Sequence, residues 1–572
     1  MDRREFLRLG TGVAAVPALA GIAAETAAAP NSGGRTPGRD IEEVTIAELQ
    51  RRMARRRLTS EELVEAYLDR IDAIDRRGPK LNSVIEVNPD AGRIARALDR
   101  ERRAGNVRGP LHGIPILLKD NVDTHDRTQT AAGSRGLVGR PPDRDATVAA
   151  KLRQAGAVLL GKAGLSEWAN FRSFHSASGW SGRGGQVKNP YVLDRNPCGS
   201  SSGSGASVSA NLCAAAIGTE TDGSIVCPSS ANGVVGIKPT VGLTSRAGVV
   251  PIAASQDTVG PHGRTVADAA AVLGAIASTM PDDRDPATRT NRNKVFSDYT
   301  QFLDPNGLAG ARIGVARAGV TGYSEETDEV YEEAIKAIRA AGVTVVDPAD
   351  IPTINDPNAG AAEITVLVFE FRRDLNAYLA TRTGVEITSL ASAIAFNEAD
   401  DVELRWFLQE WFEEAERQPY TEAEYLAARD TARRLGGPDG IDAVLAQFDL
   451  DAVVAPTGSP AWTTDLVNGD HFLGASSGPA AIAGYPLISV PAGDSFGLPV
   501  GLTFMGTAYS EPTLIKLASG FEAAKHARRK PQFLPTLPTG PTSGGRHRHH
   551  SSRRQLATNA SPAEGRPTHV HL

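Results

Sequence analysis

The sequence predicts one large α/β fold, in which a central mixed sheet is covered by helices and by a helical lobe. Strand-like apolar runs alternate with helical segments, which is the pattern of a sheet with helices packed against it. The strand-like runs are 114–118, 157–160, 312–316, 343–346, 452–455 and 487–490, and helical patterns occur at 147–154 and 328–341. The stretch from about 363 to 435 is helical almost throughout and predicts the lobe. No internal repeat divides the chain, so we expect one core rather than independent domains.

Two capping boxes predict helices ahead of the first strand. Thr45 is followed three residues later by Glu48, and Thr59 by Glu62. In this pattern the hydroxyl and the carboxylate each satisfy an N–H group at the helix start. Apolar residues then recur at helical spacing over 63–71, which predicts one buried helix face. These helices are assigned to the core and to no chemistry.

The composition is that of a globular protein and argues against two classes of partner. The 572 residues carry a formal net charge of −6, and basic residues are not concentrated outside the termini. A nucleic-acid-binding surface needs a positive patch, so we expect no nucleic-acid partner. After the first residues, no segment offers the roughly 18 consecutive apolar residues of a membrane span. We therefore expect no membrane association in the mature form.

The two ends of the chain differ from its middle. Arg3 and Arg4 precede an apolar, Ala-rich stretch, which is typical of a twin-arginine export signal over residues 1–30. The sequence thus predicts an exported protein, periplasmic or extracellular, with its main folded domain at 40–535. The polar, His-rich segment 538–572 is predicted to be a disordered tail, and its spacing does not support a metal site.

Three cysteines, Cys198, Cys213 and Cys227, lie in one short Ser/Gly-rich stretch. So low and odd a count excludes a dense disulfide framework in an exported chain. One bridge remains open, but the favoured interpretation is that all three are small buried apolar residues.

The Gly/Ser run 199–205 has the composition of a flexible linker. The apolar residues around it argue against that interpretation and favour a run buried in the core, where Gly permits close backbone approach. Within it, Gly199-x-Ser201-x-Gly203 matches the nucleophile elbow of α/β-hydrolases. That motif needs a preceding strand, which the sequence before Gly199 does not offer, so we disfavour it.

Several motifs in order resemble the amidase signature family over residues 41–535. They are Gly113-Ile114-Pro115 leading to Lys119-Asp120-Asn121, the run 199–205, Thr221-Asp222-Gly223-Ser224-Ile225, Gly236-Ile237-Lys238-Pro239-Thr240, and Gln256-Asp257 with Gly260-Pro261. The stretch Thr219 to Pro228 is most similar to the bacterial peptide amidase branch. The resemblance implies an amidase-signature-type fold and an amide-hydrolysing enzyme.

The resemblance also implies a Ser-Ser-Lys catalytic triad. Ser224 would be the nucleophile, Lys119 the base, and Ser200, in a cis peptide, the proton relay between them. A serine hydroxyl needs a base to become a good nucleophile, and no histidine lies in the stretch from Asn196 to Thr240. Lysine can act as the base only when neutral, so its pKa must fall by roughly three units, worth about 4 kcal/mol. Burial can supply that shift.

The backbone N–H groups of Thr221, Asp222 and Gly223 are the oxyanion donors that the resemblance implies. It also implies that Ser201 supports the relay by hydrogen bonding. Asp222 stands where glycine is commoner in the family, as do Cys198 and Ser202. A carboxylate there can orient a polar or cationic part of the substrate; the alternative is that it caps local backbone.

The predicted function is hydrolysis of carboxamide C–N bonds, with peptide C-terminal amides or other small amides as substrates. One alternative is a glutamine-hydrolysing component of the amidotransferase A type, and the other is an aryl or aliphatic acylamidase. A catalytically silent binding protein is disfavoured because Lys119, Ser200 and Ser224 are all present. We expect no metal, no organic cofactor and no obligatory protein partner.

Overall fold

The computed structural model describes residues 40–290 and 292–538. The predicted export signal at 1–30 lies outside these residues, and so does the predicted tail at 538–572 except for its first residue. Within the described ranges, no helix is both long enough and apolar enough to cross a membrane.

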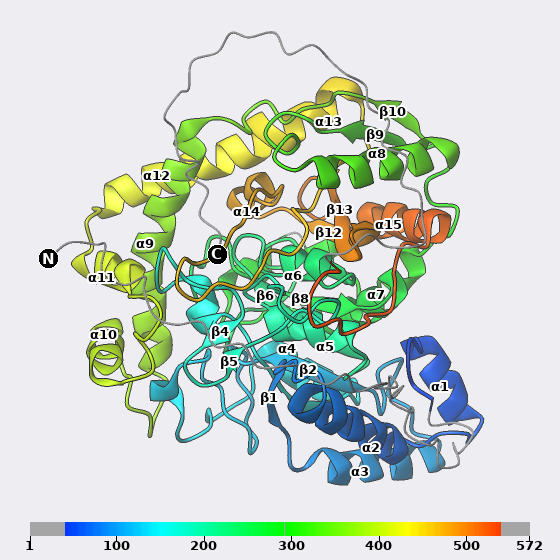
Figure 1. The fold of residues 1–572 in the computed structure, drawn as a ribbon, viewed down its shortest axis with the longest axis vertical. Helices are drawn as coiled ribbons and strands as arrows, with labels where there is room; N and C mark the ends of the chain where they lie inside the picture. Colours follow the sequence, from blue (N-terminus) through cyan, green and yellow to red (C-terminus); the bar gives the residue numbers. More distant parts are fainter. Residues whose placement is uncertain (1–39, 291, 539–572) are drawn as a thin grey trace, which may run out of the picture.

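An eleven-stranded mixed sheet forms the centre of the molecule (Figure 1). In spatial order its strands are β1 (Val84–Val87), β3 (Val158–Ala163), β2 (Pro115–Lys119), β6 (Ala215–Glu220), β8 (Thr258–Gly263), β7 (Val235–Lys238), β12 (Leu487–Ser495), β13 (Leu498–Met505), β11 (Ala452–Pro456), β9 (Arg312–Val315) and β10 (Thr344–Val346). Pairing is parallel within β3–β2–β6 and within β11–β9–β10, and antiparallel between these two groups and at β1. A small hairpin pairs β4 (Trp180–Ser181) with β5 (Gly185–Gln186). The predicted mixed sheet is confirmed.

Helices pack around this sheet. They are α1 (Ile46–Ala54), α2 (Ser60–Arg70), α3 (Ala91–Arg103), α4 (Thr147–Gln154), α5 (Ser202–Ser209), α6 (Val226–Ala231), α7 (Val266–Ile276), α8 (Glu325–Ala340), α9 (Pro357–Leu379), α10 (Leu390–Ala399), α11 (Glu410–Arg417), α12 (Glu422–Gly436), α13 (Asp442–Phe448), α14 (Gly478–Ala483) and α15 (Glu511–Lys525). Short 3-10 and π turns occur at 71–77, 135–137, 167–170, 286–289, 292–294, 300–302 and 437–441. In Figure 1, α1–α3 lie at the end of the sheet that holds β1–β3, whereas α8, α13 and α15 lie beside β9–β13.

The helix starts follow the predicted capping residues. Thr59 and Glu62 form the reciprocal capping box of α2. Thr45 accepts the Glu48 N–H at the start of α1, but the Glu48 carboxylate binds Arg51 and Arg52 rather than completing the box. An arginine within one helical turn offers a charged partner, which is stronger than a backbone N–H.

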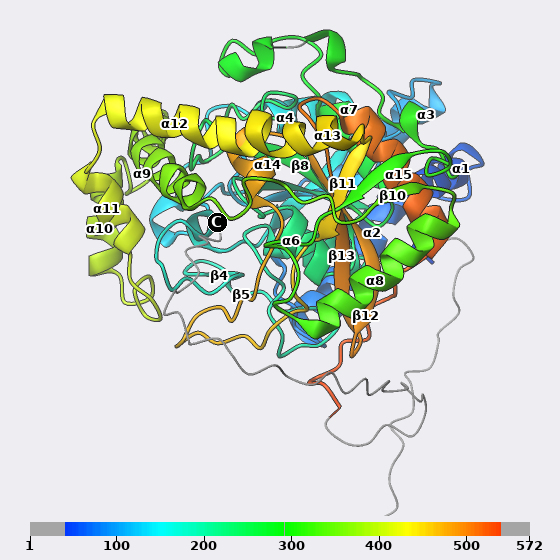
Figure 2. The ribbon, with the colours of Figure 1, turned by 90° about the horizontal axis from the view of Figure 1, so that it is seen from above.

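The helical lobe consists of α9–α12 and projects to one side of the sheet (Figure 2). It confirms the lobe predicted from about 363 to 435. Its apolar core includes Phe371, Phe412 and Trp168, so the lobe packs against the segment that follows β3. The fully buried Arg172 fixes this junction, because its guanidinium lies 2.9 Å from the Glu167 carboxylate and 3.6 Å from that of Glu403 before α11.

Candidate active site

The side chain of Lys119 lies at the last position of β2, a strand whose five residues are all buried. Its Nζ atom is 2.7 Å from Ser200 Oγ, 2.9 Å from Thr219 Oγ1 and 3.2 Å from the Thr219 carbonyl oxygen. A neutral amine has two N–H groups and one lone pair. A neutral lysine can donate twice to Thr219 and accept the Ser200 hydroxyl, whereas a charged lysine donates all three contacts.

Burial gives Lys119 the pKa that a base needs. The side chain is fully buried, and desolvation lowers its pKa to about 7, although the negative charges of Glu220 and Asp257 oppose the shift. His262 is also buried nearby, and desolvation together with the Lys119 charge lowers its pKa to about 3, so it stays neutral. Lys119 is thus partly neutral near pH 7.

Ser200 connects Lys119 to Ser224. The Gly199–Ser200 peptide bond is cis, as the family resemblance implied. Ser200 Oγ lies 2.9 Å from Ser224 Oγ, and the Ser200 backbone N–H donates to the same Ser224 oxygen at 3.0 Å. Both serines are buried, so a continuous series of contacts runs from Lys119 Nζ through Ser200 Oγ to Ser224 Oγ.

Ser201 lies beside this series rather than within it. Its hydroxyl donates to the Thr219 carbonyl at 3.0 Å and accepts the Thr219 N–H at 3.2 Å, while its own N–H donates to the Ser224 carbonyl at 3.1 Å. Ser201 therefore connects β6 to the turn that carries Ser224. The residues before Ser201 form no strand, which agrees with the rejection of the nucleophile elbow.

The turn that carries Thr221, Asp222 and Gly223 joins β6 to α6. Gly223 has a φ of +78°, a conformation that side chains disfavour. Thr221 Oγ1 donates to Asp257 Oδ1 at 2.6 Å. The Glu220 carboxylate, just before the turn, accepts N–H groups of the chain after Ser224 at 2.6 and 3.0 Å, which fixes both sides of the turn.

The Asp222 carboxyl has another side chain as its partner. Its hydrogen-bonding partner is the Ser477 side chain, and burial raises its pKa to about 6. In the described part of the chain, its Oδ1 atom is buried without a hydrogen-bond partner. Asp222 lines a cavity of about 470 Å³ and also a smaller one of about 20 Å³ that includes Gly199 and Gly223. The interpretation of Asp222 as a cap of local backbone is therefore not supported.

The favoured interpretation of three unpaired cysteines is wrong, and the single bridge that the sequence left open is present. Cys198 and Cys227 form a disulfide, and only Cys213 among the three is a free, buried thiol. The Ser/Gly-rich composition of the stretch gives no sign that the segments with Cys198 and Cys227 fold back on one another. The loop before Ser200 packs on α6, where Asn232 Nδ2 donates to the Pro197 carbonyl at 2.8 Å.

Comparisons with known proteins identify the family of this chain. The Amidase family model matches residues 62–515. The chain belongs to the amidase family. It is 44% identical over 502 residues to a probable amidase of Arabidopsis thaliana, covering 86% of this chain and 92% of the relative. It is 34% identical over 505 residues to the A component of the glutamyl-tRNA(Gln) amidotransferase of Thermosynechococcus vestitus, covering 83% of this chain and 97% of the relative.

Among solved structures, this amidase is similar to the native peptide amidase of Stenotrophomonas maltophilia. The two share 52% sequence identity with a TM-score of 0.82, over 86% of this chain and 99% of the other. An amidase family protein of Bacillus anthracis gives 35% identity and a TM-score of 0.78, over 86% of this chain and 93% of the other. The predicted family, fold class and enzyme class are confirmed, and the chain is an amidase.

Sequence reasoning assigned no role to some residues that shape the site of this amidase. Thr219, Glu220 and Asp257 stood in the motifs but were interpreted only as part of the family pattern. Glu363, on α9, carried no signal at all, because a single glutamate in a helical stretch resembles a solvated surface residue.

In the described ranges, no group of three or more His, Cys, Asp or Glu residues is arranged to hold a metal ion.

Proposed function

We propose that this amidase hydrolyses small carboxamides, with peptide C-terminal amides as the preferred class, by Ser-Ser-Lys nucleophilic catalysis. The observation that carries the proposal is the buried series of contacts from Lys119 Nζ to Ser200 Oγ at 2.7 Å and on to Ser224 Oγ at 2.9 Å. It connects a nucleophile to a base whose pKa is near neutrality.

In the acylation step, Ser224 Oγ attacks the carbonyl carbon of the amide. Its proton passes to Ser200 Oγ, while the Ser200 proton passes to Lys119 Nζ. When the tetrahedral intermediate collapses, the C–N bond breaks and a proton returns along the same route to the leaving nitrogen. Water then hydrolyses the resulting ester of Ser224 by the reverse sequence, releasing the acid.

The oxyanion of the intermediate needs donors held in place before the reaction. We assign this role to the backbone N–H groups of Thr221, Asp222 and Gly223. The side-chain bond from Thr221 to Asp257 and the Glu220 carboxylate support this turn from both sides. One such donor contributes roughly 3–4 kcal/mol of transition-state stabilisation. Ser201 acts as a positioning residue, through its bonds to Thr219 and Ser224.

Similarity to a solved peptide amidase supports peptide amides as the substrate class. Similarity to a component of an amidotransferase supports glutamine as the second candidate, at lower identity. Hydrolysis of aryl or aliphatic amides would use the same acyl transfer. Only the substrate pocket would therefore distinguish these amides from peptide amides.

We also propose that the protein is exported through the predicted twin-arginine signal. The disulfide between Cys198 and Cys227 supports this, because disulfides persist in oxidising compartments. Replacing Arg3 and Arg4 by lysine should keep the amidase in the cytoplasmic fraction of a bacterial host. Equal periplasmic activity with and without the arginine pair would contradict export by this route.

The catalytic proposal is tested with an amidated dipeptide, free glutamine and an aryl amide, followed by release of ammonia or amine. Ser224→Ala, Ser200→Ala and Lys119→Ala should abolish release from every substrate that the wild type hydrolyses. Ser204→Ala is the matched control, because Ser204 is a buried serine of the same run whose hydroxyl donates to the Ile217 carbonyl, at 2.9 Å, and not to the triad. Release from the aryl amide alone would change the substrate class. Activity that survives Ser224→Ala would disprove the mechanism.

A further inference from the structure

A cavity of about 470 Å³ lies beside the turn that carries the nucleophile. Its walls come mainly from chain segments far from the catalytic motifs. They include the loop around Tyr323, the first half of α9, the end of α12 and the segment from Phe472 to α14. Apolar side chains such as Ile354 and Leu435 line much of it. Among the described lining residues, Asp222, two positions before Ser224, is the only one that belongs to the catalytic turn.

Two carboxyl groups face this cavity. Asp222 is 7% exposed and Glu363, on α9, is 8% exposed, and both are lining residues. Glu363 Oε1 accepts a hydrogen bond from Gln256 Nε2 at 2.9 Å, and Asp222 is bonded by Ser477. Asp222 Oδ1, by contrast, is buried without a partner in the described ranges. A buried carboxylate oxygen without a partner is costly, so Asp222 Oδ1 is free to accept a donor from a ligand in the cavity.

The charge of these carboxyls is not neutralised within the cavity. Its described lining contains no Lys, Arg or His. Burial raises the pKa of both groups, and the negative charge of Asp222 adds to the rise for Glu363. The positive charge of Lys238 favours the ionised form of Asp222, but its Nζ donates to the Ala480 and Tyr485 carbonyls at 3.1 and 2.6 Å and does not line the cavity. A cation bound between Asp222 and Glu363 would relieve their repulsion.

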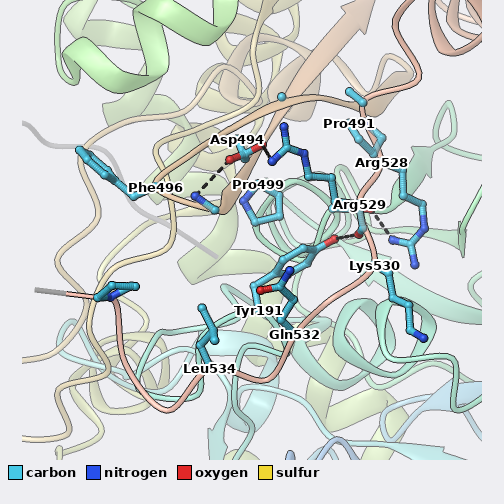
Figure 3. Close-up of a pocket in the computed structure, with 15 residues that line it drawn as sticks. Tyr191, Pro491, Asp494, Phe496, Pro499, Arg528, Arg529, Lys530, Gln532 and Leu534 are labelled. Carbon is cyan, nitrogen blue, oxygen red and sulfur yellow. Dashed lines mark hydrogen bonds and ion pairs between the residues drawn. The ribbon is translucent and has the colours of Figure 1, made fainter. Parts of the chain in front are cut away.

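A second cavity shows the contrasting case (Figure 3). It measures about 280 Å³ and also collects charged side chains. There each basic group already has an acidic partner: Arg528 binds Glu43, Arg529 lies 3.0 Å from Asp494, and Lys530 binds Glu42. These pairs leave little unbalanced charge for a ligand to neutralise, unlike Asp222 and Glu363.

We propose that the cavity beside Ser224 binds a cationic group of the substrate's acyl part, an ammonium or guanidinium on an aliphatic stem, and that Asp222 and Glu363 are its receptors. The apolar walls suit the stem, and the aromatic rings of Tyr323 and Phe472 suit a nearby cation. The proposal rests on the proposed amidase function and specifies its substrate: amides of lysine-like or arginine-like residues. Asp222 would serve both parts of the site, because its N–H is assigned to the oxyanion and its side chain lines the cavity.

The test compares N-acetyl-lysine amide with N-acetyl-norleucine amide, which has the same stem without the charge, at pH 8. For the wild type we expect kcat/KM to be about tenfold higher for the lysine amide. The reason is that its ammonium can make a charge-assisted hydrogen bond, which the norleucine side chain cannot make. Glu363→Gln should reduce this ratio to about two, by raising KM for the lysine amide. Glu370→Gln is the matched control, because Glu370 is a buried glutamate of the same helix that binds Ser255 and Tyr425 instead of lining the cavity. It should keep the wild-type ratio.

A ratio near or below one in the wild type would overturn the proposal, and so would a ratio that Glu363→Gln leaves intact. Hydrolysis of norleucine amide reports on the amidase function separately, so its absence would count against the proposed function instead. If Glu363→Gln does not fold, inhibition of the wild type decides: butylamine should inhibit norleucine amide hydrolysis competitively and about tenfold more strongly than butanol. Equal inhibition by the two would refute the cation site.

Discussion

Two buried lysines on neighbouring strands have different surroundings. Lys119 ends β2, and Lys162 lies on the adjacent parallel strand β3, opposite Leu118. Both side chains are fully buried, and desolvation lowers the pKa of Lys119 to about 7 and that of Lys162 to about 8. Lys162 donates to the Val122 carbonyl at 2.6 Å and to Thr130 Oγ1 at 2.9 Å. Lys119 instead contacts the hydroxyl that leads to Ser224.

The comparison shows that burial alone does not make a lysine a base. The carboxyls of Asp120 and Asp123 favour the charged form of Lys162, so its ammonium neutralises buried acids. Lys119 has hydroxyl and carbonyl partners, and the acids that act on it, Glu220 and Asp257, are engaged with N–H groups and with Thr221. We therefore infer that the groups around the amine distinguish Lys119, the proposed base, from Lys162, whose proposed role is structural.

The largest expected effect is on catalysis. Lys119→Met should lower kcat/KM by roughly 10⁴-fold, because no other group can take the proton from Ser200. Lys162→Met, the matched change on the neighbouring strand, should lower it less than about tenfold at temperatures where the protein is folded. Steady-state assays on both variants measure the contrast. Equal losses would show that the two lysines are not functionally distinct.

The next effect concerns stability and runs in the opposite direction. Lys162→Met leaves Asp120 and Asp123 buried with one positive neighbour fewer, and should lower the free energy of unfolding by about 3 kcal/mol. Lys119→Met removes a buried amine without leaving an acid unpaired, and should lower it by less than about 1 kcal/mol. Urea unfolding at pH 8 measures both values. If Lys119→Met proved the more destabilising, the assignment of the structural role to Lys162 would fail.

A smaller effect is the pH dependence of the wild type. Protonated Lys119 cannot accept a proton, and its pKa is about 7. With an uncharged substrate, kcat/KM should therefore fall about tenfold per pH unit below 7 and level off above it. A pH–rate profile of norleucine amide hydrolysis between about pH 5 and 9 measures this fall of kcat/KM at low pH, which is the acid limb of the profile. An acid limb centred near 10 would mean that the base is an unshifted lysine.

The smallest effect should come from Thr219, which contacts Lys119 but not Ser224. Its hydroxyl accepts the Lys119 N–H and also the Asn121 side-chain N–H. Thr219→Val removes a partner that stabilises the ammonium, and should move the acid limb down by about half a pH unit with little change in the plateau. Thr130→Val, the equivalent change beside Lys162, should leave the profile in place. A shift upward in Thr219→Val would contradict this account of the Lys119 pKa.

The sequence predicted those strands whose local hydrophobic pattern matches their burial in the structure. The run 114–118 became β2 and 157–160 became β3, because continuous apolar runs bounded by turns suit fully buried strands. The strands β6 and β8 were not predicted, since residues such as Ala, Gly and Thr give them no clear hydrophobic pattern. β6 nevertheless carries Thr219 and leads to the nucleophile.

The proposed triad was predicted from motifs that stand in order along the chain, and the order of motifs can be read without knowledge of the tertiary structure. The disulfide and the cavity wall depend instead on which segments meet in space. Cys198 and Cys227 are 29 residues apart, yet their Cα atoms lie 6.0 Å apart. Glu363 reaches the cavity of Asp222 from a helix much later in the chain, and nothing local in its sequence indicates that meeting.

The positions of the triad residues and of the cavity-lining residues along the chain have a consequence for how such an enzyme evolves. Lys119, Ser200 and Ser224 fall within one stretch of chain, whereas the described cavity wall, apart from Asp222, comes from residues 319–482. Mutations within residues 319–482 can alter which amides fit the cavity without changing Lys119, Ser200 or Ser224. In the proposed roles, Asp222 lacks that freedom: a change there would alter selectivity and rate together, so new specificities should arise first through α9 and the segment before α14.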